Sequence, residues 1–200
     1  YSAGNSTSLP GTLVCQSDNG TCPGGDSHAQ GAQLYAYSMI YWFGQWFGRN
    51  SLDDRGMQIN STVHYGVNNQ SAYWNGQMMV YGDGYGFALA DDIVAHELTH
   101  GVTQNESNLF NWYQSGAISE SLSDLWGEAV DQFNGLGTDT SAVKWQIGED
   151  VSGHGVFRSL SNPTTYGQPD SITSTKYCKS GTCLTTDNGG VHTNGGVNNK

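Results

Sequence analysis

Residues 95–104 read AHELTHGVTQ and place two histidines, His96 and His100, four positions apart with Glu97 between them. Residues four apart on a helix lie one turn apart on the same face, so a helix here lets both rings reach one metal ion. Glu97 is then rotated by about 100° around the helix, beside the ion, where a base for a metal-bound water belongs. A solvated helix face is the plain alternative, and this motif alone does not decide between the two.

A second stretch, GAISESLSDLWGE, favours the metal centre over the solvated face. Two of its acids, Glu120 and Asp124, are again four positions apart and share one helix face. A catalytic zinc ion needs three protein ligands and one open position, and Glu120 supplies the third ligand. Asp124, one turn later, can accept the remaining ring proton of a ligand histidine, although an ordinary surface charge also explains Asp124 alone.

The charge balance narrows the kinds of partner. The chain has 18 Asp and Glu against 7 Lys and Arg, which argues against nucleic acid and anionic membranes, because phosphate binding needs a basic face. The excess carboxylates suit hard cations such as calcium. No apolar run approaches the roughly 20 residues of a membrane span. The chain begins at Tyr1 without a signal-like segment, so we interpret it as processed, mature protein.

The four cysteines form two close pairs in sequence, Cys15 with Cys22 and Cys178 with Cys183. Each pair flanks a turn that contains glycine, which favours local disulfides among the three pairings that four cysteines allow. A zinc site is the alternative, but neither spacing is CxxC and neither loop contains a histidine. Disulfides indicate an oxidising compartment, so we expect a secreted protein.

The order of the elements predicts an α+β fold. Residues 32–48 are apolar and aromatic on most sides and predict a buried helix, and strand-like pieces follow at 61–67 and 71–84. Helices are then expected from Asp91 onward and at 117–133. We therefore expect a β-rich N-terminal lobe over residues 1–90 with one aromatic helix. Residues 91–200 are expected to hold the metal-binding helices and the start of a helical C-terminal lobe.

Several long motifs together resemble the thermolysin family of secreted neutral metalloproteases, which includes pseudolysin. The resemblance rests on AHELTHGVTQ, SGAISESLSDLWGE, AYWNGQMMVYGDG, IGEDV with RSLSNP, and DNGGVHTNGGVNNK. These run from about residue 61 to the end, in the family's order and nearly its spacing. The resemblance implies a zincin fold, with a β-rich part, a central HExxH helix and a helical second lobe.

The same resemblance implies roles for individual residues. His96, His100 and Glu120 would bind zinc, and Glu97 would take a proton from zinc-bound water and deliver it to the leaving amine. His192 matches the family's histidine that stabilises the tetrahedral oxyanion. Asp187 matches the carboxylate that orients it. Outside this motif, His192 would be interpreted as an ordinary loop histidine.

Substrate binding is also implied by the resemblance. Arg158, in RSLSNP, matches the arginine that binds the substrate carbonyl after the scissile bond, and the substrate would lie antiparallel to an edge strand from Ala72 to Trp74. An apolar pocket implies cleavage on the amino side of bulky hydrophobic residues. Its candidate walls, for which core packing is an equal explanation, are Phe87, Leu89, Ile93, Ile147 and Phe157.

Two departures from the family affect the substrate side. The family usually has a tyrosine nine residues before the third ligand as a second oxyanion donor, and this chain has Asn111 there, with Tyr113 close by. The family's asparagine that holds substrate backbone falls at Ser71, next to Asn68 and Asn69. Neither departure changes a zinc ligand.

Calcium is the second expected ion. The family positions that bind calcium are matched by Asp92, Glu128, Asp131 and Glu149. Lys144 stands where the family has another ligand carboxylate, so we expect one calcium ion, with the Gln146 carbonyl as a candidate ligand, instead of a paired site. An acidic surface without calcium is the alternative.

Two other functional classes stay open. An aminopeptidase would need an acidic anchor for a free amine, which we do not find in the sequence. A non-catalytic relative would have lost chemical groups that this chain retains. VHTNGGVNNK predicts the start of a helix, and the family has further structure on both sides, so we expect these residues to be part of a larger two-lobe protease. The expected partner is a pro-region or the remaining C-terminal lobe, and a minimal enzyme whose last helix is dispensable is the alternative.

Overall fold

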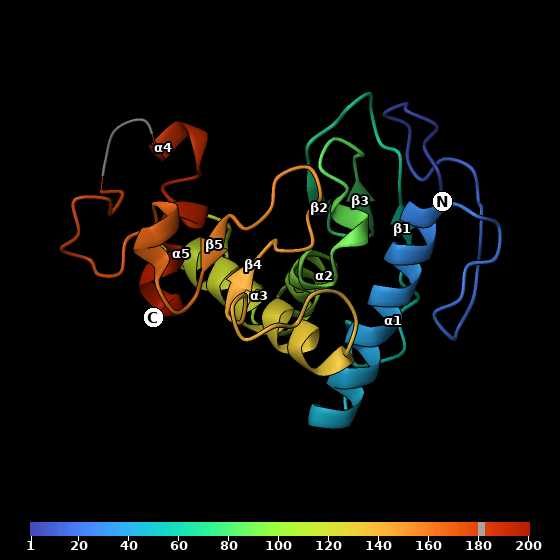
Figure 1. Cartoon of the computed structure of the whole chain (residues 1–200), viewed down its shortest axis with the longest axis horizontal. Coiled ribbons are helices and arrows are strands. Elements are labelled where there is room, and N and C mark those ends of the chain that lie inside the picture. The colour runs from blue at the N-terminus through green and yellow to red at the C-terminus, as the bar shows by residue number, and fades with distance from the viewer. Residues whose placement is uncertain (180–182) are drawn as a thin grey trace.

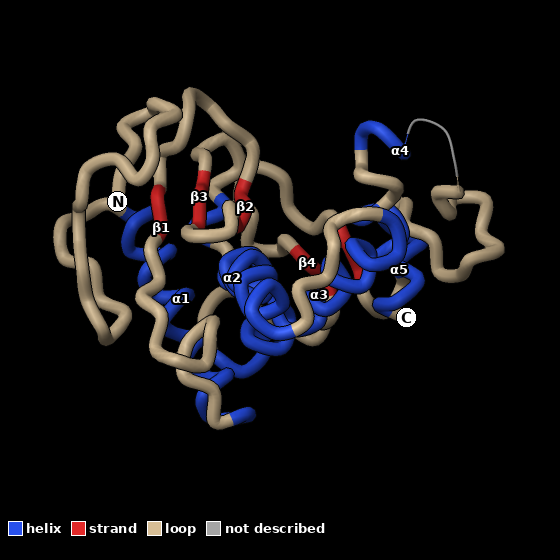
Figure 2. The backbone as a smooth tube through the Cα atoms, turned by 180° about the vertical axis from the view of Figure 1, so that it is seen from behind, coloured by secondary structure: helices blue, strands red, loops and turns tan. Residues whose placement is uncertain are grey.

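The computed structural model describes residues 1–179 and 183–200, in which helices dominate and strands are short (Figures 1 and 2). The two termini lie at opposite ends of the long axis. The helices are α1 Ser27–Phe47, α2 Asp91–Glu106, α3 Tyr113–Asn134, α4 Cys183–Thr186 and α5 Val191–Asn199, with 3₁₀ turns η1 Phe87–Leu89 and η2 Pro163–Tyr166. The strands are β1 Ser61–Thr62, β2 Ala72–Trp74, β3 Met79–Tyr81, β4 Gln146–Ile147 and β5 Arg158–Ser159. Helices and strands follow one another in separate runs without regular β-α-β alternation, so the α+β prediction is confirmed.

Helix α1 begins five residues before the predicted start at residue 32. The cause is a cap, because the side chain of Asp26 accepts a hydrogen bond from the backbone N–H of Ala29 at 3.1 Å. One face of α1 is buried through small and apolar residues such as Ala32, Met39 and Phe43. The opposite face leaves aromatic side chains such as Phe47 exposed, so the prediction of a buried helix is correct for one face only.

The N-terminal half contains a three-stranded sheet in the order β1-β3-β2. Strand β3 pairs in parallel with β1 and antiparallel with β2, and its residues Met79, Val80 and Tyr81 are fully buried. The strands fall within the predicted segments 61–67 and 71–84, but each spans only two or three residues. Because β2 pairs only with β3, its other edge is open for hydrogen bonding within the described residues.

Helices α2 and α3 pack side by side at the centre of the molecule (Figures 1 and 2). Gly127 of α3 allows this contact, because a Cβ atom there would lie 2.6 Å from the backbone oxygen of Asp92 and 3.3 Å from the Cβ atom of His96. The predicted helices at 91 and 117–133 are thus confirmed, and α3 extends further, to a left-handed cap at Gly135.

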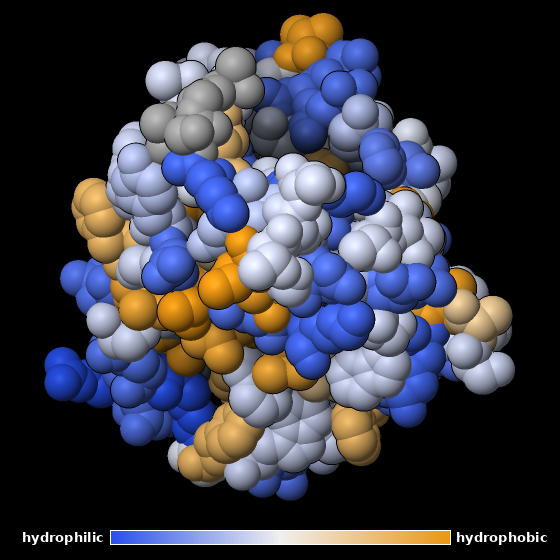
Figure 3. All heavy atoms as spheres, turned by 90° about the vertical axis from the view of Figure 1, so that its left-hand side faces the viewer, coloured by the Kyte–Doolittle hydropathy of each residue, from blue (hydrophilic) through white to orange (hydrophobic). Residues whose placement is uncertain are grey.

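Helix α5 packs on α3 at the end of the molecule opposite α1. The surface at this end is mostly hydrophilic, with a hydrophobic area near the middle of the face and smaller ones towards its rim (Figure 3). Both predicted cysteine pairs are disulfides, with Cα–Cα distances of 5.5 Å for Cys15–Cys22 and 6.2 Å for Cys178–Cys183. The predicted turn at 180–182 inside the second pair lies outside the described residues. No helix in the described ranges is long and apolar enough to cross a bilayer.

Candidate metal centre

The packing of α2 on α3 brings His96, His100 and Glu120 together. The Nε2 atom of His96 lies 3.5 Å from Glu120 Oε2, and that of His100 lies 3.4 Å from Glu120 Oε1. These separations are longer than ordinary hydrogen bonds, and they suit three ligands of one tetrahedral ion, whose ligand atoms are about 3.3 Å apart. The chemistry of the set, two imidazoles and one carboxylate, therefore fits zinc.

Asp124 connects this centre to the following chain. Its Oδ1 atom lies 2.9 Å from His96 Nδ1, as predicted from the helix spacing. It also accepts hydrogen bonds from Arg158, from Nη2 at 2.6 Å and from Nε at 2.9 Å, and from Asn199 Nδ2 at 3.1 Å. With 1% of its surface exposed, Asp124 is a buried anion shared by His96 and Arg158. The reading of Asp124 as a surface charge is wrong.

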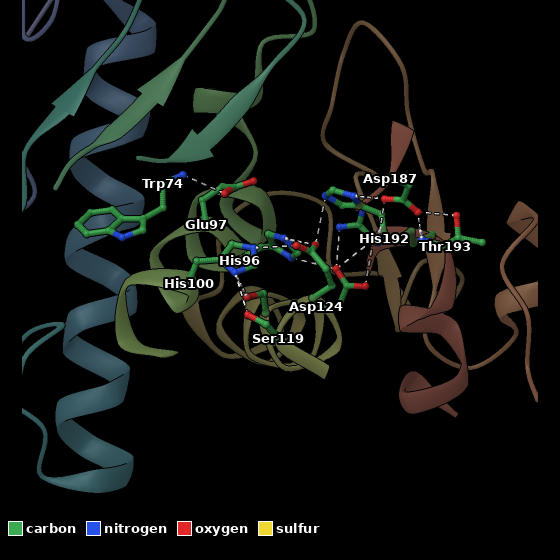
Figure 4. A network of polar contacts seen from close by, with 12 residues as sticks. Trp74, His96, Glu97, His100, Ser119, Asp124, Asp187, His192 and Thr193 are labelled. Atoms are coloured by element: carbon green, nitrogen blue, oxygen red, sulfur yellow. Dashed lines mark hydrogen bonds and ion pairs between the residues drawn. The ribbon is translucent and has the colours of Figure 1, made fainter. Parts of the chain in front are cut away.

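Serine hydroxyls orient the second histidine, a feature that sequence reasoning missed. The Nδ1 atom of His100 lies 3.3 Å from the hydroxyls of both Ser119 and Ser123, which belong to α3 (Figure 4). Such partners fix which ring nitrogen carries the proton and leave Nε2 for a metal. The signal in the sequence is their position, since Ser119 and Ser123 are four apart and precede Glu120 and Asp124 by one residue each.

Glu97 lies between the histidines and the open edge of the sheet. Its Oε2 atom accepts a hydrogen bond of 3.2 Å from the backbone N–H of Trp74 in β2. The indole of Trp74 donates to Gln104 of α2 at 2.7 Å, which ties the edge strand to the helix that carries Glu97. Glu97 therefore faces the place where an extended chain would pair with β2.

His192 and Asp187 lie on the other side of the centre from Trp74 and Glu97 (Figure 4). His192 Nδ1 hydrogen-bonds to Asp187 Oδ1 at 2.7 Å, and its Nε2 is 3.6 Å from Glu120 Oε2. The second carboxylate oxygen of Asp187 accepts from the hydroxyl and the backbone N–H of Thr193 at 2.7 and 2.9 Å. The His192 side chain is 61% exposed, so it meets solvent while Asp187 holds its ring.

The buried ionisable groups of the centre shift each other's pKa values. Burial alone would lower the pKa of His96, but the carboxylates of Asp124 and Glu120 raise it to about 10. Burial opposes ionisation of Glu120, yet the three histidines around it hold its pKa well below the usual range. The pKa of His100 is lowered, chiefly by burial, so its ring favours the neutral form that binds metals. The hydrogen bond to Asp187 raises the pKa of His192.

An apolar cluster adjoins Arg158. Ile93 and Ile147 are buried in it, and Phe87 and Phe157 pack against it with ring centroids 6.2 Å apart. The guanidinium of Arg158 lies 5.0 Å from the centre of the Phe157 ring. Of the five predicted pocket residues, Leu89 lies outside this cluster, with its side chain toward Gly31 of α1.

Comparison with known proteins gives the family of this chain. The sequence profile described as "Thermolysin metallopeptidase, catalytic domain" matches residues 1–104, and that described as "Thermolysin metallopeptidase, alpha-helical domain" matches residues 107–200. The chain belongs to the thermolysin family. The resemblance inferred from the motifs is confirmed.

Individual relatives agree with this assignment. A bacillolysin from Bacillus cereus is 43% identical over all of this chain, and an extracellular metalloprotease from Pectobacterium carotovorum is 41% identical over 96% of it. The solved structure of a protealysin precursor from Serratia proteamaculans superposes with a TM-score of 0.84 at 40% identity over the whole chain. The chain spans only 35% of the bacillolysin, 58% of the Pectobacterium protein and 65% of the protealysin precursor.

This thermolysin-family chain differs from the usual pattern beside His192. Tyr113, which has a positive φ of 50°, donates its backbone N–H to the oxygen of Asn188 at 2.9 Å. A Cβ atom at Gly189 would lie 2.8 Å from the Tyr113 ring, so the ring packs on the loop that carries Asp187. Asn111, at the position of the family's tyrosine, lies over Gly116 of α3.

A second group of carboxylates gathers where α2 begins. The four predicted calcium residues are joined by two that were missed, Asp91 and Asp150, whose oxygens lie within 4.8 Å of each other and of Asp131. Asp92 is held by backbone N–H groups of Ile93 and Gly148, both at 2.6 Å. Buried oxygens of this group have no hydrogen-bond partner among the described residues, on Asp91, Glu128, Asp131 and Glu149.

Burial and repulsion between neighbouring carboxylates raise the pKa values of these acids and favour their protonated forms. Burial raises the pKa of Glu128 to about 7, and burial with neighbouring carboxylates raises the pKa values of Asp92, Asp131 and Glu149. Lys144 does not neutralise them by an ion pair within the described chain, because its ammonium lies over the Trp145 ring, 5.7 Å from the centroid. The group has the donors of a hard-cation site.

Proposed function

We propose that this chain carries the catalytic centre of a secreted, zinc-dependent endopeptidase that cleaves on the amino side of bulky hydrophobic residues. The observation that carries the proposal is the convergence of His96, His100 and Glu120, with Glu97 directed to the open edge of β2. When bound, zinc polarises a carbonyl oxygen and lowers the pKa of a water molecule towards about 7.

Glu97 is the proposed general base. It takes a proton from the attacking water and returns it to the amine of the departing product, so one carboxylate serves both steps. The backbone N–H of Trp74 keeps it directed at the substrate edge. The open edge of β2, from Ala72 to Trp74, is the proposed place where an extended peptide pairs by backbone hydrogen bonds.

His192 is the proposed donor to the oxyanion that forms on the scissile carbonyl. Asp187 fixes the ring through Nδ1 and favours its protonated form, so Nε2 can donate a proton in a hydrogen bond. Arg158 uses Nε and Nη2 for Asp124, which leaves the Nη1 edge for a substrate carbonyl. The apolar cluster beside Arg158 supports a preference for a bulky apolar residue after the cleaved bond.

Two measurements test the activity. Purified protein should contain zinc and hydrolyse casein, and 1,10-phenanthroline should abolish hydrolysis. Internally quenched peptides blocked at both ends should be cleaved, whereas an aminopeptidase would need a free amine. Mass spectrometry of a digested peptide library gives the residue that follows each cut, and cuts without preference for large apolar residues would reject the proposed specificity.

We also propose that the acidic group binds one calcium ion. Its buried, unpaired carboxylate oxygens support this, since calcium prefers several hard oxygen ligands. The ion would join α2, α3 and the segment at 146–150, and the Gln146 carbonyl is a further candidate ligand. The site is tested by titrating calcium into chelator-treated protein in a calorimeter. If no heat of binding is measured, the calcium site is rejected.

The two disulfides support secretion, and so does the name of the Pectobacterium relative, an extracellular metalloprotease. The protealysin neighbour is a precursor, which supports a pro-region as an intramolecular partner. The proposed partners are otherwise protein or peptide substrates, with neither nucleic acid nor membrane. Recovery of the mature protein from the culture medium, with its disulfides formed, tests the location.

A further inference from the structure

Two histidines outside the catalytic centre meet near the start of α1. His28 is the second residue of α1, His64 follows β1, and Asp83 follows β3. One ligand atom from each of these three residues lies within 4.8 Å of the others. The three side chains come from segments far apart in the sequence, and no local pattern pointed to their meeting.

In this cluster His64 is hydrogen-bonded through both ring nitrogens, whereas Nδ1 of His28 is not hydrogen-bonded to any residue that the structure describes. His64 Nδ1 hydrogen-bonds to Asp83 Oδ2 at 2.7 Å, and its Nε2 hydrogen-bonds to Asp26 Oδ2 at 3.0 Å. His28 Nδ1 lies 3.2 Å from Asp83 Oδ1, yet this pair lacks hydrogen-bond alignment. Both atoms are buried and have no hydrogen-bond partner in the described part of the chain. A buried polar pair of this kind needs a third partner.

The separation of this pair indicates what the partner is. Its 3.2 Å is close to the 3.4 and 3.5 Å that separate the histidine nitrogens from Glu120 in the catalytic centre. Ligands of a tetrahedral ion with bonds of about 2.0 Å stand about 3.3 Å apart. Both centres also have the same donors, two imidazoles and a carboxylate, which suit zinc and related transition ions better than calcium.

The surroundings favour a cation. No lysine or arginine pairs with Asp26 or Asp83 within the described residues. Asp26 also accepts from Ala29 N–H, so it is fixed in place to receive the distal ring proton of His64, as carboxylates beside metal-bound histidines do. The side chains are between 18% and 32% exposed, so an ion can enter from solvent without unfolding.

We propose that His28, His64 and Asp83 bind a second zinc-type divalent ion, with Asp26 orienting His64. The ion would join the beginning of α1 to the ends of β1 and β3, elements that are in contact in the structure. Its role is structural, because these residues are separate from the ligands and the base of the catalytic centre. It does not depend on the proposed peptidase activity.

The test counts zinc with the catalytic centre intact and with it removed. Protein stripped by a chelator is dialysed against zinc in excess calcium, and metal is measured by atomic emission. The wild type should hold about two ions, since each centre completes its own ligand set, and both His28→Ala and His100→Ala should hold about one. The double variant should hold none. His154→Ala, which removes the remaining histidine outside both centres, should match the wild type.

Thermal melting gives a readout free of activity. Zinc should raise the melting temperature of His100→Ala in proportion to the logarithm of its concentration and should have no effect on the double variant. Asp83→Asn, which keeps the shape of the side chain, replaces His28→Ala if the latter fails to fold. One zinc per wild-type chain, or a zinc-independent melting temperature in folded His100→Ala, would mean that a protonated His64 alone bridges the two carboxylates, and the proposal would be wrong.

Discussion

Glu97 is the residue at which binding and chemistry can be separated. Glu97→Gln keeps an oxygen to accept from Trp74 N–H and removes only the proposed base. We expect unchanged zinc content. We expect kcat to fall by about 10²-fold to 10⁴-fold, the usual contribution of general acid–base catalysis. Hydrolysis of a quenched peptide measures kcat, and metal analysis of the same preparation measures the zinc content. An empty metal site in this variant would contradict its assignment as a base that does not ligate.

Asp124 has a different role, because it compensates buried positive charge. Asp124→Asn would leave Arg158 buried beside a neutral amide and weaken the hold on His96, whose pKa would fall. We expect a loss of about 3 kcal/mol in the free energy of unfolding and a zinc affinity lowered about 10-fold to 100-fold. Urea unfolding and competition with a zinc chelator measure these.

The matched control is Asp170→Asn, which breaks the exposed pair with Lys200 at 3.3 Å. An exposed pair contributes little, so this variant should unfold like the wild type. Equal losses in the two variants would mean that the buried Asp124 contributes no more to stability than an exposed charge does.

At the scale of elements, the sequence predicted which side chains share a helix face, and it missed contacts that depend on how a strand docks or where a cap lies. The pairs at 96 and 100 and at 120 and 124 were predictable because helical spacing alone sets which side chains share a face. The pairing of Asp124 with Arg158, 34 residues later, depends on how β5 docks beside α3, which no periodicity encodes. The start of α1 was missed because its cap, Asp26, precedes the apolar pattern.

The contact between α2 and α3 is the element-scale feature most open to test. In Gly127→Ala the added methyl would meet the backbone oxygen of Asp92, which cannot move without moving α2 and the ligand His96. We expect about 1–3 kcal/mol of destabilisation and weaker zinc binding, because overpacking shifts backbone.

Gly44→Ala in α1 is the control for that substitution. The nearest atom to its added methyl is the Arg49 oxygen at 3.4 Å, an ordinary contact, so the better helix propensity of alanine should leave stability equal or higher. Chemical denaturation and metal analysis compare the two variants. If both variants were equally stable, the interface between α2 and α3 could accept a methyl group at Gly127, and the predicted overpacking would be wrong.

At the scale of the molecule, the proposed metal sites join segments that also pack together in hydrophobic core clusters. The catalytic centre joins α2 to α3, the acidic group joins them to the segment at 146–150, and the cluster at His28 joins α1 to the sheet. The division into lobes at residue 90 stays a prediction. The short strands explain why ions would contribute so much here, since the sheet alone offers few backbone pairs.

The acidic group makes a stability prediction that depends on pH and calcium. In the unfolded chain its acids titrate near their ordinary pKa values of 3.8 and 4.5, whereas in the fold that of Glu128 is about 7 and those of Asp131 and Glu149 are also raised. The folded state therefore binds more protons above about pH 4, and stability must fall as the pH rises through 7. Without calcium we expect a loss on the order of a few kcal/mol between pH 5 and about 8.

Calcium should reverse this trend, because a bound cation favours the ionised carboxylates and stabilises the fold by mass action. Melting curves from about pH 5 to 8, with chelator or with millimolar calcium, measure the difference, and magnesium at equal ionic strength is the control. Lys144→Asp should strengthen the calcium effect, because it restores the acid that the family has at this position and removes a positive charge near Glu128. A melting temperature that falls with pH equally in chelator and in calcium would mean that these carboxylates bind no ion and are only an acidic cluster, stable while it keeps its protons.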